Sequence, residues 1–418
     1  MSNTTRQHAK FGAAAYADLR GRLPQPYPRP MGANTMKYLQ EVVDSGLTVD
    51  MTGRFERAFA SAMGVKHCVS APGCTNAIAV LAASLGLAPG DEVVMSPIAD
   101  YGTVMGFINV GLIPVFADTD PAPGKPNVTV ETIASHLGTR TRAIVCVHKT
   151  GIICDMDPIV ALGRRHDIPV FEDACQAAYG KYKGRYAGTL ADGGVFSFDS
   201  EKSIGSDVGG CLITNDDRLA ETARFMGHAR GAEMRPGFGR VHTAPGLAMR
   251  MPQCTAAVTL AQIEEAPTRI AARDRAARRI LRGLKDIPGI IPLHVPDYVD
   301  VYSCWMMGFS LEPAAFRCTA DEFGRQLDEA GLSGASTARY YLLPAALPFL
   351  TERAAQRRWP YDGATASRPH RYDASTTPHA ARFLEYFIRW TSFCEKYTDE
   401  HTDLAVEIVR QVVERNRS

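Results

Sequence analysis

Residues 170–202 read VFEDACQAAYGKYKGRYAGTLADGGVFSFDSEK, and they combine a strand ending in a carboxylate with a second strand leading to a lysine. In the first strand the apolar run ends at Asp173, and an amide, Gln176, follows three residues later. A cofactor with a protonated ring nitrogen needs a fixed anion beside it, and a carboxylate at a strand end can supply one. An Asp at a strand end more often caps the next helix, so this motif alone does not establish a cofactor site.

The second strand, residues 193–198, leads to Lys202. A lysine amine forms an imine with a carbonyl cofactor, and it must be partly neutral to do so. Burial or a nearby cation lowers the pKa of a lysine and so favours the neutral form. A solvated loop position is the ordinary fate of lysine, and Lys149, Lys181 and Lys183 are rival candidates. The last two lie in GKYKGRY, a polar, hairpin-like stretch that we interpret as surface.

A third motif, SAPGCTNA at residues 70–77, joins a strand to a helix through small residues. Backbone N–H groups at a helix start, together with the Thr75 hydroxyl, are suited to holding a phosphate. The stretch is not a P-loop, because no Gly-Lys-Ser/Thr follows it. An ordinary N-cap turn explains the same residues equally well.

Short apolar strands and helices alternate on both sides of these motifs. Strands are expected at 66–70, 91–95, 113–117, 142–148, 168–172, 193–198, 209–214 and 303–311. Helices are expected at 36–45, 54–63, 74–87, 101–110, 129–137, 156–165, 252–286, 319–330 and 399–415, and loops at 46–53 and 343–382. Apolar strands such as AIVCVH and IPVFED, separated by helices, predict a parallel or mixed sheet covered on both faces. Ligands in such sheets bind at the carboxyl ends of the strands.

Composition limits the class of protein. A chain of 418 residues is longer than one compact core usually holds, so two domains are expected. Hydrophobic residues make up 45% and charged residues 22%, as in an ordinary globular protein, and the net charge of +1 gives no electrostatic reason to bind nucleic acid or a membrane surface. Ten scattered cysteines without a CxxC pair predict reduced thiols and no metal. Because we find neither a long apolar run nor a signal peptide, we expect a cytoplasmic protein.

Together the motifs resemble the DegT/DnrJ/EryC1/StrS sugar aminotransferases, which are fold-type-I pyridoxal phosphate enzymes. The matching stretches are LAPGDEVVMSP, PVFADTD, MDPI, VFEDACQAAYGKYKGRYAGTLADGGVFSF, Lys202 and GGCLITND. The resemblance implies an α/β fold with a large domain, built on a mostly parallel seven-stranded sheet between helices, and a smaller C-terminal α+β domain. We expect an N-terminal arm at 1–35, the cofactor-binding large domain at 36–265 and the small domain at 266–418.

The resemblance also implies a role for each matching residue. Lys202 is the Schiff-base lysine and moves the proton between the cofactor and the substrate carbon. Asp173 pairs with the pyridine nitrogen, and Gln176 contacts the side of the ring that carries the hydroxyl. The phosphate is held by Ser197, Cys74 and Thr75, where Cys74 stands at a position that is usually Gly.

Several positions depart from the family pattern. The residue aligned with the usual ring-stacking aromatic is Asp100, and we expect the adjacent Tyr101 to stack on the cofactor instead. Ala178 replaces a common His, and Ala248 replaces an Asn that often reaches the phosphate of the partner subunit. Arg250 is retained, and it could bind phosphate or substrate or pair with a carboxylate across the interface.

His148 ends a strand at the place this family expects for a substrate contact, although a satisfied structural histidine is the commoner interpretation of such a residue. Trp305 and Trp390 are interpreted as packing residues, with a substrate wall as the alternative.

Three functions remain open from the sequence. The first is an aminotransferase that moves an amino group from glutamate or glutamine to a keto-sugar or keto-aminocyclitol, as in amino-sugar or aminoglycoside-type secondary metabolism. The resemblance implies that it is a homodimer with active sites at the interface. The second is an epimerase or eliminating enzyme that uses the same cofactor on an amino sugar without net transamination. The third is a cofactor-binding regulator or silent scaffold.

Overall fold

The computed structural model describes residues 19, 21–228, 233–242 and 246–417. Most of the predicted N-terminal arm, and the terminus examined for a signal peptide, therefore lie outside the described residues. Among the described helices none is both long and apolar enough to cross a membrane.

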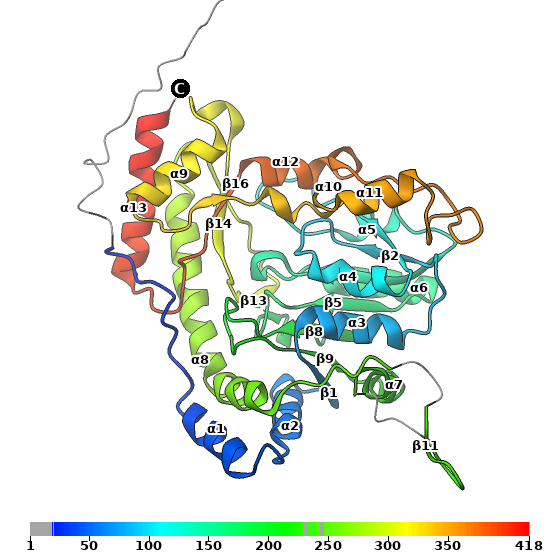
Figure 1. Ribbon diagram of the computed structural model, residues 1–418. Helices are drawn as coiled ribbons and strands as arrows, with labels where there is room; N and C mark the ends of the chain where they lie inside the picture. Colours follow the sequence, from blue (N-terminus) through cyan, green and yellow to red (C-terminus); the bar gives the residue numbers. More distant parts are fainter. Residues whose placement is uncertain (1–18, 20, 229–232, 243–245, 418) are drawn as a thin grey trace, which may run out of the picture.

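A seven-stranded sheet forms the centre of the larger part of the molecule (Figure 1), with the strand order β1-β9-β8-β5-β4-β2-β3. Its strands are β1 (His67–Ala71), β2 (Glu92–Met95), β3 (Ile113–Phe116), β4 (Thr141–Val147), β5 (Val170–Asp173), β8 (Gly193–Ser197) and β9 (Gly210–Thr214). Neighbouring strands are parallel except at β9, which runs antiparallel to both β1 and β8. The predicted mostly parallel seven-stranded sheet is confirmed.

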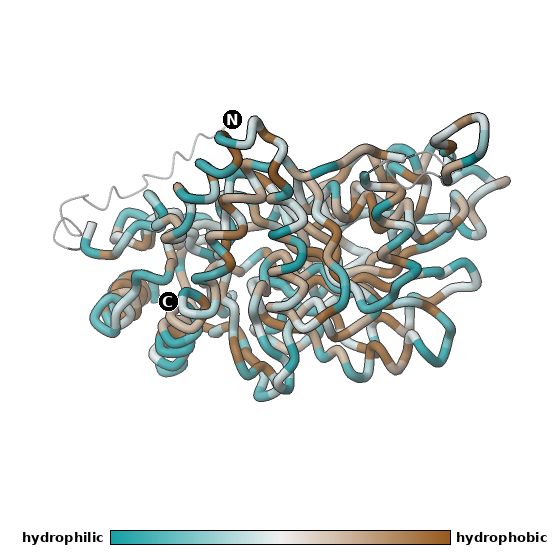
Figure 2. Tube along the Cα trace, turned by 90° about the horizontal axis from the view of Figure 1, so that it is seen from below, coloured by the Kyte–Doolittle hydropathy of each residue, from teal (hydrophilic) through white to brown (hydrophobic). Residues whose placement is uncertain are grey.

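Helices cover both faces of this sheet because successive side chains of each strand point to opposite sides. In β4, Ile144 and Cys146 join one apolar core, and Val145 and Val147 join the other. The first core is completed by α1 (Thr35–Asp44), α2 (Met51–Met63), α5 (Val130–Ala134), α6 (Met156–His166) and α8 (Gln253–Leu284). The second core is completed by α3 (Cys74–Ser84), α4 (Gly102–Asn109) and α7 (Asp217–His228). Figure 2 shows the apolar segments gathered inside and the hydrophilic ones along the outer helices and loops.

The small domain is built on the C-terminal half of α8, which extends beyond the large sheet (Figure 1). Its antiparallel sheet has the order β12-β14-β16-β15. Its elements are β12 (Ile290–Pro292), β14 (Met307–Leu311), η3 (Pro313–Ala315), α9 (Ala320–Ala330), β15 (Ser336–Thr337), β16 (Phe387–Trp390) and α13 (Asp399–Asn416). The predicted boundary at residue 265 falls inside α8, so this helix connects the two domains without a break.

Two smaller β structures lie outside these sheets. The predicted hairpin at GKYKGRY is present, and it pairs with a later strand to form a three-stranded sheet. Its strands are β6 (Lys181–Tyr182), β7 (Arg185–Tyr186) and β13 (Val299–Val301). A second hairpin projects from the body of the molecule (Figure 1) and consists of β10 (Glu233–Arg235) and β11 (Gly239–Val241).

The prediction that residues 343–382 form a loop is wrong. The segment contains α10 (Leu343–Ala346), α11 (Pro348–Ala355), η5 (Ala374–Thr376) and the start of α12 (Pro378–Tyr386), and it follows η4 (Arg339–Tyr341). Its apolar side chains, including Leu343 and Leu350, join the second core of the large domain, and Tyr372 donates a hydrogen bond to the Pro114 carbonyl at 2.8 Å. The segment therefore leaves the small domain and returns to the large sheet.

The predicted loop at 46–53 is also wrong at its end, because α2 begins at Met51 rather than at residue 54. The Asp50 side chain caps this helix by accepting a hydrogen bond from the Gly53 N–H at 2.9 Å. Gly53, an unfavourable helix residue, therefore lies in the first turn, where the cap offsets its cost.

Candidate active site

The carboxyl ends of β4, β5 and β8 and the first residues of α3 and α4 open into one cavity of about 540 Å³. Parallel strands bring their carboxyl ends to the same edge of a sheet, so residues far apart in sequence meet there. Seven residues predicted from the sequence line this cavity, namely Cys74, Thr75, Tyr101, Asp173, Gln176, Ser197 and Lys202.

Asp173 is held by two hydrogen bonds at the end of β5. Its Oδ2 accepts from the Thr103 hydroxyl at 2.7 Å, and its Oδ1 accepts from the Cys175 N–H at 3.1 Å. The side chain is buried, and the two donors fix the plane of its carboxylate while leaving further lone pairs for a ligand. The sequence did not identify Thr103 because it comes from α4, 70 residues before Asp173.

Gln176 is oriented by a residue that the sequence also missed. Its Oε1 accepts a hydrogen bond from the Thr150 N–H at 2.7 Å, so its NH₂ group remains as the donor for a ligand. Thr150 lies in η2 (Lys149–Gly151) and has a φ of +58°, an uncommon value for a residue that is not glycine. The conformation of this turn therefore places the backbone N–H of Thr150 against Gln176 Oε1.

The start of α3 is suited to binding a phosphate. Its N-cap is Gly73, which offers no side-chain cap, and the first intrahelical bond runs from the Ala77 N–H to the Gly73 carbonyl. The N–H groups of the first turn thus point along the helix dipole towards the cavity. A Cβ on Gly210, in β9, would come within 2.5 Å of the Cys74 nitrogen, so glycine is required there for the close approach.

Lys202 lies in the turn after β8. Residues that are distant in the sequence hold this turn in place through hydrogen bonds to its backbone. The Tyr27 hydroxyl donates to the Ser200 carbonyl at 3.0 Å, and Arg29 donates to the Lys202 carbonyl. Trp305 donates its indole N–H to the Glu201 carbonyl at 3.0 Å, and its ring lies 3.9 Å from Lys202 Nζ. Trp305 therefore forms part of the cavity wall, which was the alternative interpretation from the sequence. Trp390 is fully buried, as expected of a packing residue.

Both candidates for the ring-stacking position line the cavity. Tyr101 is 61% exposed, immediately before α4, and Asp100 precedes it. A Cβ on Gly102 would meet the Thr75 hydroxyl at 2.4 Å, so the start of α4 packs tightly against the start of α3. Stacking by Tyr101 stays a prediction.

The rival lysines do not reach the cavity lining. Lys183 is exposed and pairs with Asp157 at 2.7 Å, and Lys181 lies on the same hairpin. Lys149 is completely buried, and its Nζ lies 3.2 Å from the centroid of the Tyr341 ring without a hydrogen-bond partner. Burial, reinforced by the positive charge of Lys202, lowers the pKa of Lys149 well below its usual value.

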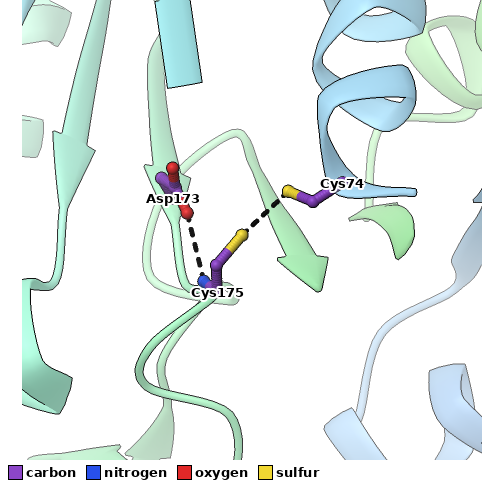
Figure 3. Close-up of side chains that lie close together, drawn as sticks. All are labelled: Cys74, Asp173 and Cys175. Atoms are coloured by element: carbon purple, nitrogen blue, oxygen red, sulfur yellow. Dashed lines mark hydrogen bonds between the residues drawn. The ribbon is translucent and has the colours of Figure 1, made fainter. Parts of the chain in front are cut away.

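Two thiols meet beside Asp173 (Figure 3). Cys74 Sγ lies 2.8 Å from Cys175 Sγ. Burial and the contact with Cys74 raise the pKa of the Cys175 thiol well above its usual value, and the Asp173 carboxylate raises it further. These two sulfurs and an Asp173 oxygen lie within 4.8 Å of one another, so they are the group that could hold a metal within the part of the chain that the structure describes.

The structure does not bring His148 into the cavity lining. Its side chain is completely buried, with Nε2 at 2.8 Å from Glu172 Oε2 and Nδ1 accepting from the Cys154 N–H at 3.3 Å. Glu172 in turn accepts from the N–H groups of Gly188, Leu190 and Ala191. Both ring nitrogens are occupied, so the geometry favours the structural interpretation of His148 over substrate contact.

Arg250 is exposed and lines a different cavity of about 470 Å³, together with residues of α2 and α7 such as Glu56 and Arg224. It makes no contact with the cavity at Lys202 of its own chain. Ala248 has a φ of +50°, and Met249 donates its backbone N–H to the Gly227 carbonyl. Binding of phosphate or substrate by Arg250 stays a prediction.

The fold and the cavity define the class. The seven-stranded sheet with an antiparallel β9, together with a carboxylate, a phosphate seat and a lysine around one cavity, has the donor set that pyridoxal phosphate needs. The protein is a fold-type-I, pyridoxal-phosphate-dependent aminotransferase. More particularly, it belongs to the DegT/DnrJ/EryC1/StrS aminotransferase family, whose model matches residues 30–367.

Curated relatives agree with this assignment. The chain is 35% identical over 249 residues to GDP-perosamine synthase of Caulobacter vibrioides, a match that covers 59% of this chain and 66% of that protein. It is 33% identical over 283 residues to the spore coat polysaccharide biosynthesis protein SpsC of Bacillus subtilis, covering 65% of this chain and 72% of the relative. The solved structure of the aminotransferase TlmJ from Streptoalloteichus hindustanus superimposes with a TM-score of 0.76 at 28% identity, covering 94% of this chain and 98% of TlmJ.

Proposed function

We propose that this aminotransferase moves an amino group from glutamate or glutamine to the ketone of a sugar or aminocyclitol, in amino-sugar or aminoglycoside-type secondary metabolism. The observation that carries the proposal is the convergence of Asp173, Gln176 and Lys202 on one cavity wide enough for a sugar ring. The relatives' names, which include a perosamine synthase and a coat polysaccharide protein, support a sugar as the acceptor.

Each residue of the cavity has a task in this proposal. When bound, pyridoxal phosphate supplies a reactive aldehyde and an electron-withdrawing ring. The Asp173 carboxylate keeps the ring nitrogen protonated, and the amide of Gln176 holds the ring hydroxyl. The N–H groups at the start of α3, with Ser197 and Thr75, bind the phosphate. Lys202 Nζ accepts a proton from the amine-bearing carbon of the donor and later delivers one to the acceptor carbon.

We further propose that the enzyme acts in the cytoplasm as a homodimer with active sites at the interface. The projecting β10–β11 hairpin supports a partner surface, because Met234 and Phe238 on it are 75% and 84% exposed. Arg250 is exposed outside its own active-site cavity, as expected of a side chain that serves the partner subunit.

The test is to incubate the purified holoenzyme with glutamate and glutamine and then with a panel of keto-sugars and keto-aminocyclitols. We expect the donors to bleach the yellow absorbance of the bound cofactor, and mass spectrometry to detect an aminated product. No bleaching with either donor or with amino sugars would contradict the proposal.

Two further measurements separate this function from the other two. Isotope exchange at the amine-bearing carbon without net transfer from glutamate would indicate an epimerase. A Lys202→Ala protein that retains full function in the cell would indicate a regulator or scaffold.

A further inference from the structure

A second cavity, of about 740 Å³, adjoins the active-site cavity. The two share four lining residues, Glu201, Trp305, Tyr340 and Tyr341. The remaining wall comes from the N-terminal arm, from α8 and from the small domain around β16. A ligand whose reacting carbon lies at Lys202 could therefore extend past Trp305 and Tyr341 into this second cavity.

Two arginines of this second cavity have a guanidinium nitrogen without a hydrogen-bond partner. The Nε atoms of Arg29 and Arg389 are buried without a hydrogen-bond partner, and neither guanidinium forms an ion pair with a carboxylate of the described residues. Arg29 donates only to the Lys202 carbonyl, and Arg389 lies 5.7 Å from the centroid of the Tyr340 ring. Both side chains are half-buried, so water does not fully solvate them.

A third arginine in the same wall, Arg273, has both an ion pair and hydrogen bonds to the protein. Arg273 pairs with Glu395 at 3.0 Å and also donates to the carbonyls of Cys304, Trp305 and Phe393. It is buried, and each of its three guanidinium nitrogens donates a hydrogen bond, as is normal for a buried charge. Arg29 and Arg389 differ from it because neither forms an ion pair within the described residues; the carboxylate whose charge acts on Arg29, that of Glu395, already pairs with Arg273.

Lys149 adds a third buried nitrogen without a hydrogen-bond partner to this region. It lies behind Tyr341, whose ring lines both cavities, and Arg389 and Lys202 are among the charges that lower its pKa. Leaving a buried cationic group without a counter-ion is costly, and such groups are normally satisfied by a bound partner. The charge and the missing bonds both indicate an anion as that partner.

We propose that the second cavity binds the anionic group, a carboxylate or a phosphate, of a substrate whose reacting carbon lies at Lys202. Arg389 and Arg29 are the ligands of that anion, and the rings of Trp305 and Tyr341 flank the path from the reacting carbon to it. This inference rests on the proposed function for the identity of the substrate, but not for the binding of the anion. The anion can come from the donor, as the distal carboxylate of glutamate, or from the acceptor, as the phosphate of an activated sugar.

The test measures the binding of two probes, 2-oxoglutarate and inorganic pyrophosphate, to the holoenzyme by titration calorimetry. We expect at least one probe to bind, and Arg389→Gln to weaken that binding by about 10- to 100-fold, the usual effect of losing a charge-assisted hydrogen bond. Arg389→Lys should restore part of the affinity. Arg339→Gln is the matched control, because Arg339 is 53% exposed and already pairs with Asp321.

The two probes distinguish the sources of the anion. Binding of 2-oxoglutarate alone assigns the cavity to the amino donor, and binding of pyrophosphate alone assigns it to a phosphorylated acceptor. If neither probe binds, or if Arg389→Gln and Arg29→Gln proteins with unchanged circular dichroism bind as wild type does, the inference is overturned. A wild-type holoenzyme that binds the probe but transfers no amino group from glutamate or glutamine to any acceptor would overturn the proposed function and leave the anion site standing.

Discussion

The two walls of the active-site region differ in how their polar groups are satisfied. On the sheet wall, formed by Asp173, Gln176 and Ser197, each side chain already has a protein hydrogen bond that orients it. On the cationic wall, formed by Arg29 and Arg389 with Lys149 buried behind Tyr341, each side chain has a buried nitrogen without a hydrogen-bond partner. Preorganised groups suit a cofactor that stays bound through many turnovers. Groups that lack partners suit a substrate that arrives and leaves.

The largest effect should come from Lys202. Replacing it with Ala removes the amine that moves the proton, so we expect the transamination rate to fall by about 1,000-fold or more. Steady-state kinetics with glutamate measure this. Lys183→Ala is the control, since that exposed lysine pairs with Asp157 at the surface. A transamination rate of Lys202→Ala within tenfold of wild type would show that the Lys202 amine does not transfer the proton.

Asp173→Asn should have the next largest effect. The amide keeps the shape but removes the negative charge, so we expect kcat to fall by roughly 100-fold, a typical effect of losing one electrostatic contact to the reacting system. Thr103→Val removes the donor to Oδ2 and should cost less, because the Cys175 N–H still orients the carboxylate. If Thr103→Val cost as much as Asp173→Asn, orientation rather than charge would be the main contribution of the sheet wall.

Lys149→Leu should stabilise the ligand-free protein, by about 1 to 3 kcal/mol near neutral pH. Burial lowers the pKa of this lysine in the folded state, so the unfolded chain binds the proton more tightly and wild type is destabilised below the unfolded pKa. The gain should therefore shrink as the pH rises towards about 10.4, the ordinary lysine value. Chemical denaturation at several pH values measures it, and a gain independent of pH would point to packing instead of charge.

The same substitution links stability to binding. If Lys149 contributes to the cationic wall, the stabilised protein should bind the anionic probe more weakly than wild type. Unchanged probe affinity in Lys149→Leu would restrict the cationic wall to the two arginines.

Cys175→Ala should have the smallest effect. The bond that orients Asp173 comes from the Cys175 backbone N–H and not from its thiol, so we expect cofactor affinity to change by less than about threefold. Sensitivity of cofactor binding to a thiol-oxidising reagent such as diamide should disappear, because Cys74 then has no thiol partner. Loss of cofactor affinity in Cys175→Ala without any oxidant would show that the thiol itself shapes the sheet wall.

The sheet wall could be predicted from the sequence because its residues lie in local patterns. The end of a strand at Asp173 and the start of a helix after Gly73 can each be recognised from a few neighbouring residues in the sequence. The residues that orient them, Thr103 and Thr150, have no local pattern, because each acts through a contact with a distant part of the chain.

The cationic wall could not be predicted for the same reason. Arg29 and Arg389 are 360 positions apart (389 − 29), and only the packing of the arm and the small domain beside Lys202 brings both to one cavity. The helices within residues 343–382 were missed because the stretch is rich in Pro, Arg, Ala and Thr and shows no regular apolar spacing. Its few apolar side chains become ordered by the face of the large domain that they cover.

The return of residues 343–382 to the large sheet limits how this protein can be divided. A fragment that ended at residue 265 would lack Leu343, Leu350 and Tyr372, and the apolar surface beneath them would face water. Such a fragment should aggregate, and the C-terminal remainder would carry an unsupported apolar strap. Modular engineering, such as exchanging acceptor specificity by swapping small domains between relatives, would have to exchange residues 343–382 together with the surface around β3, on which Tyr372 packs.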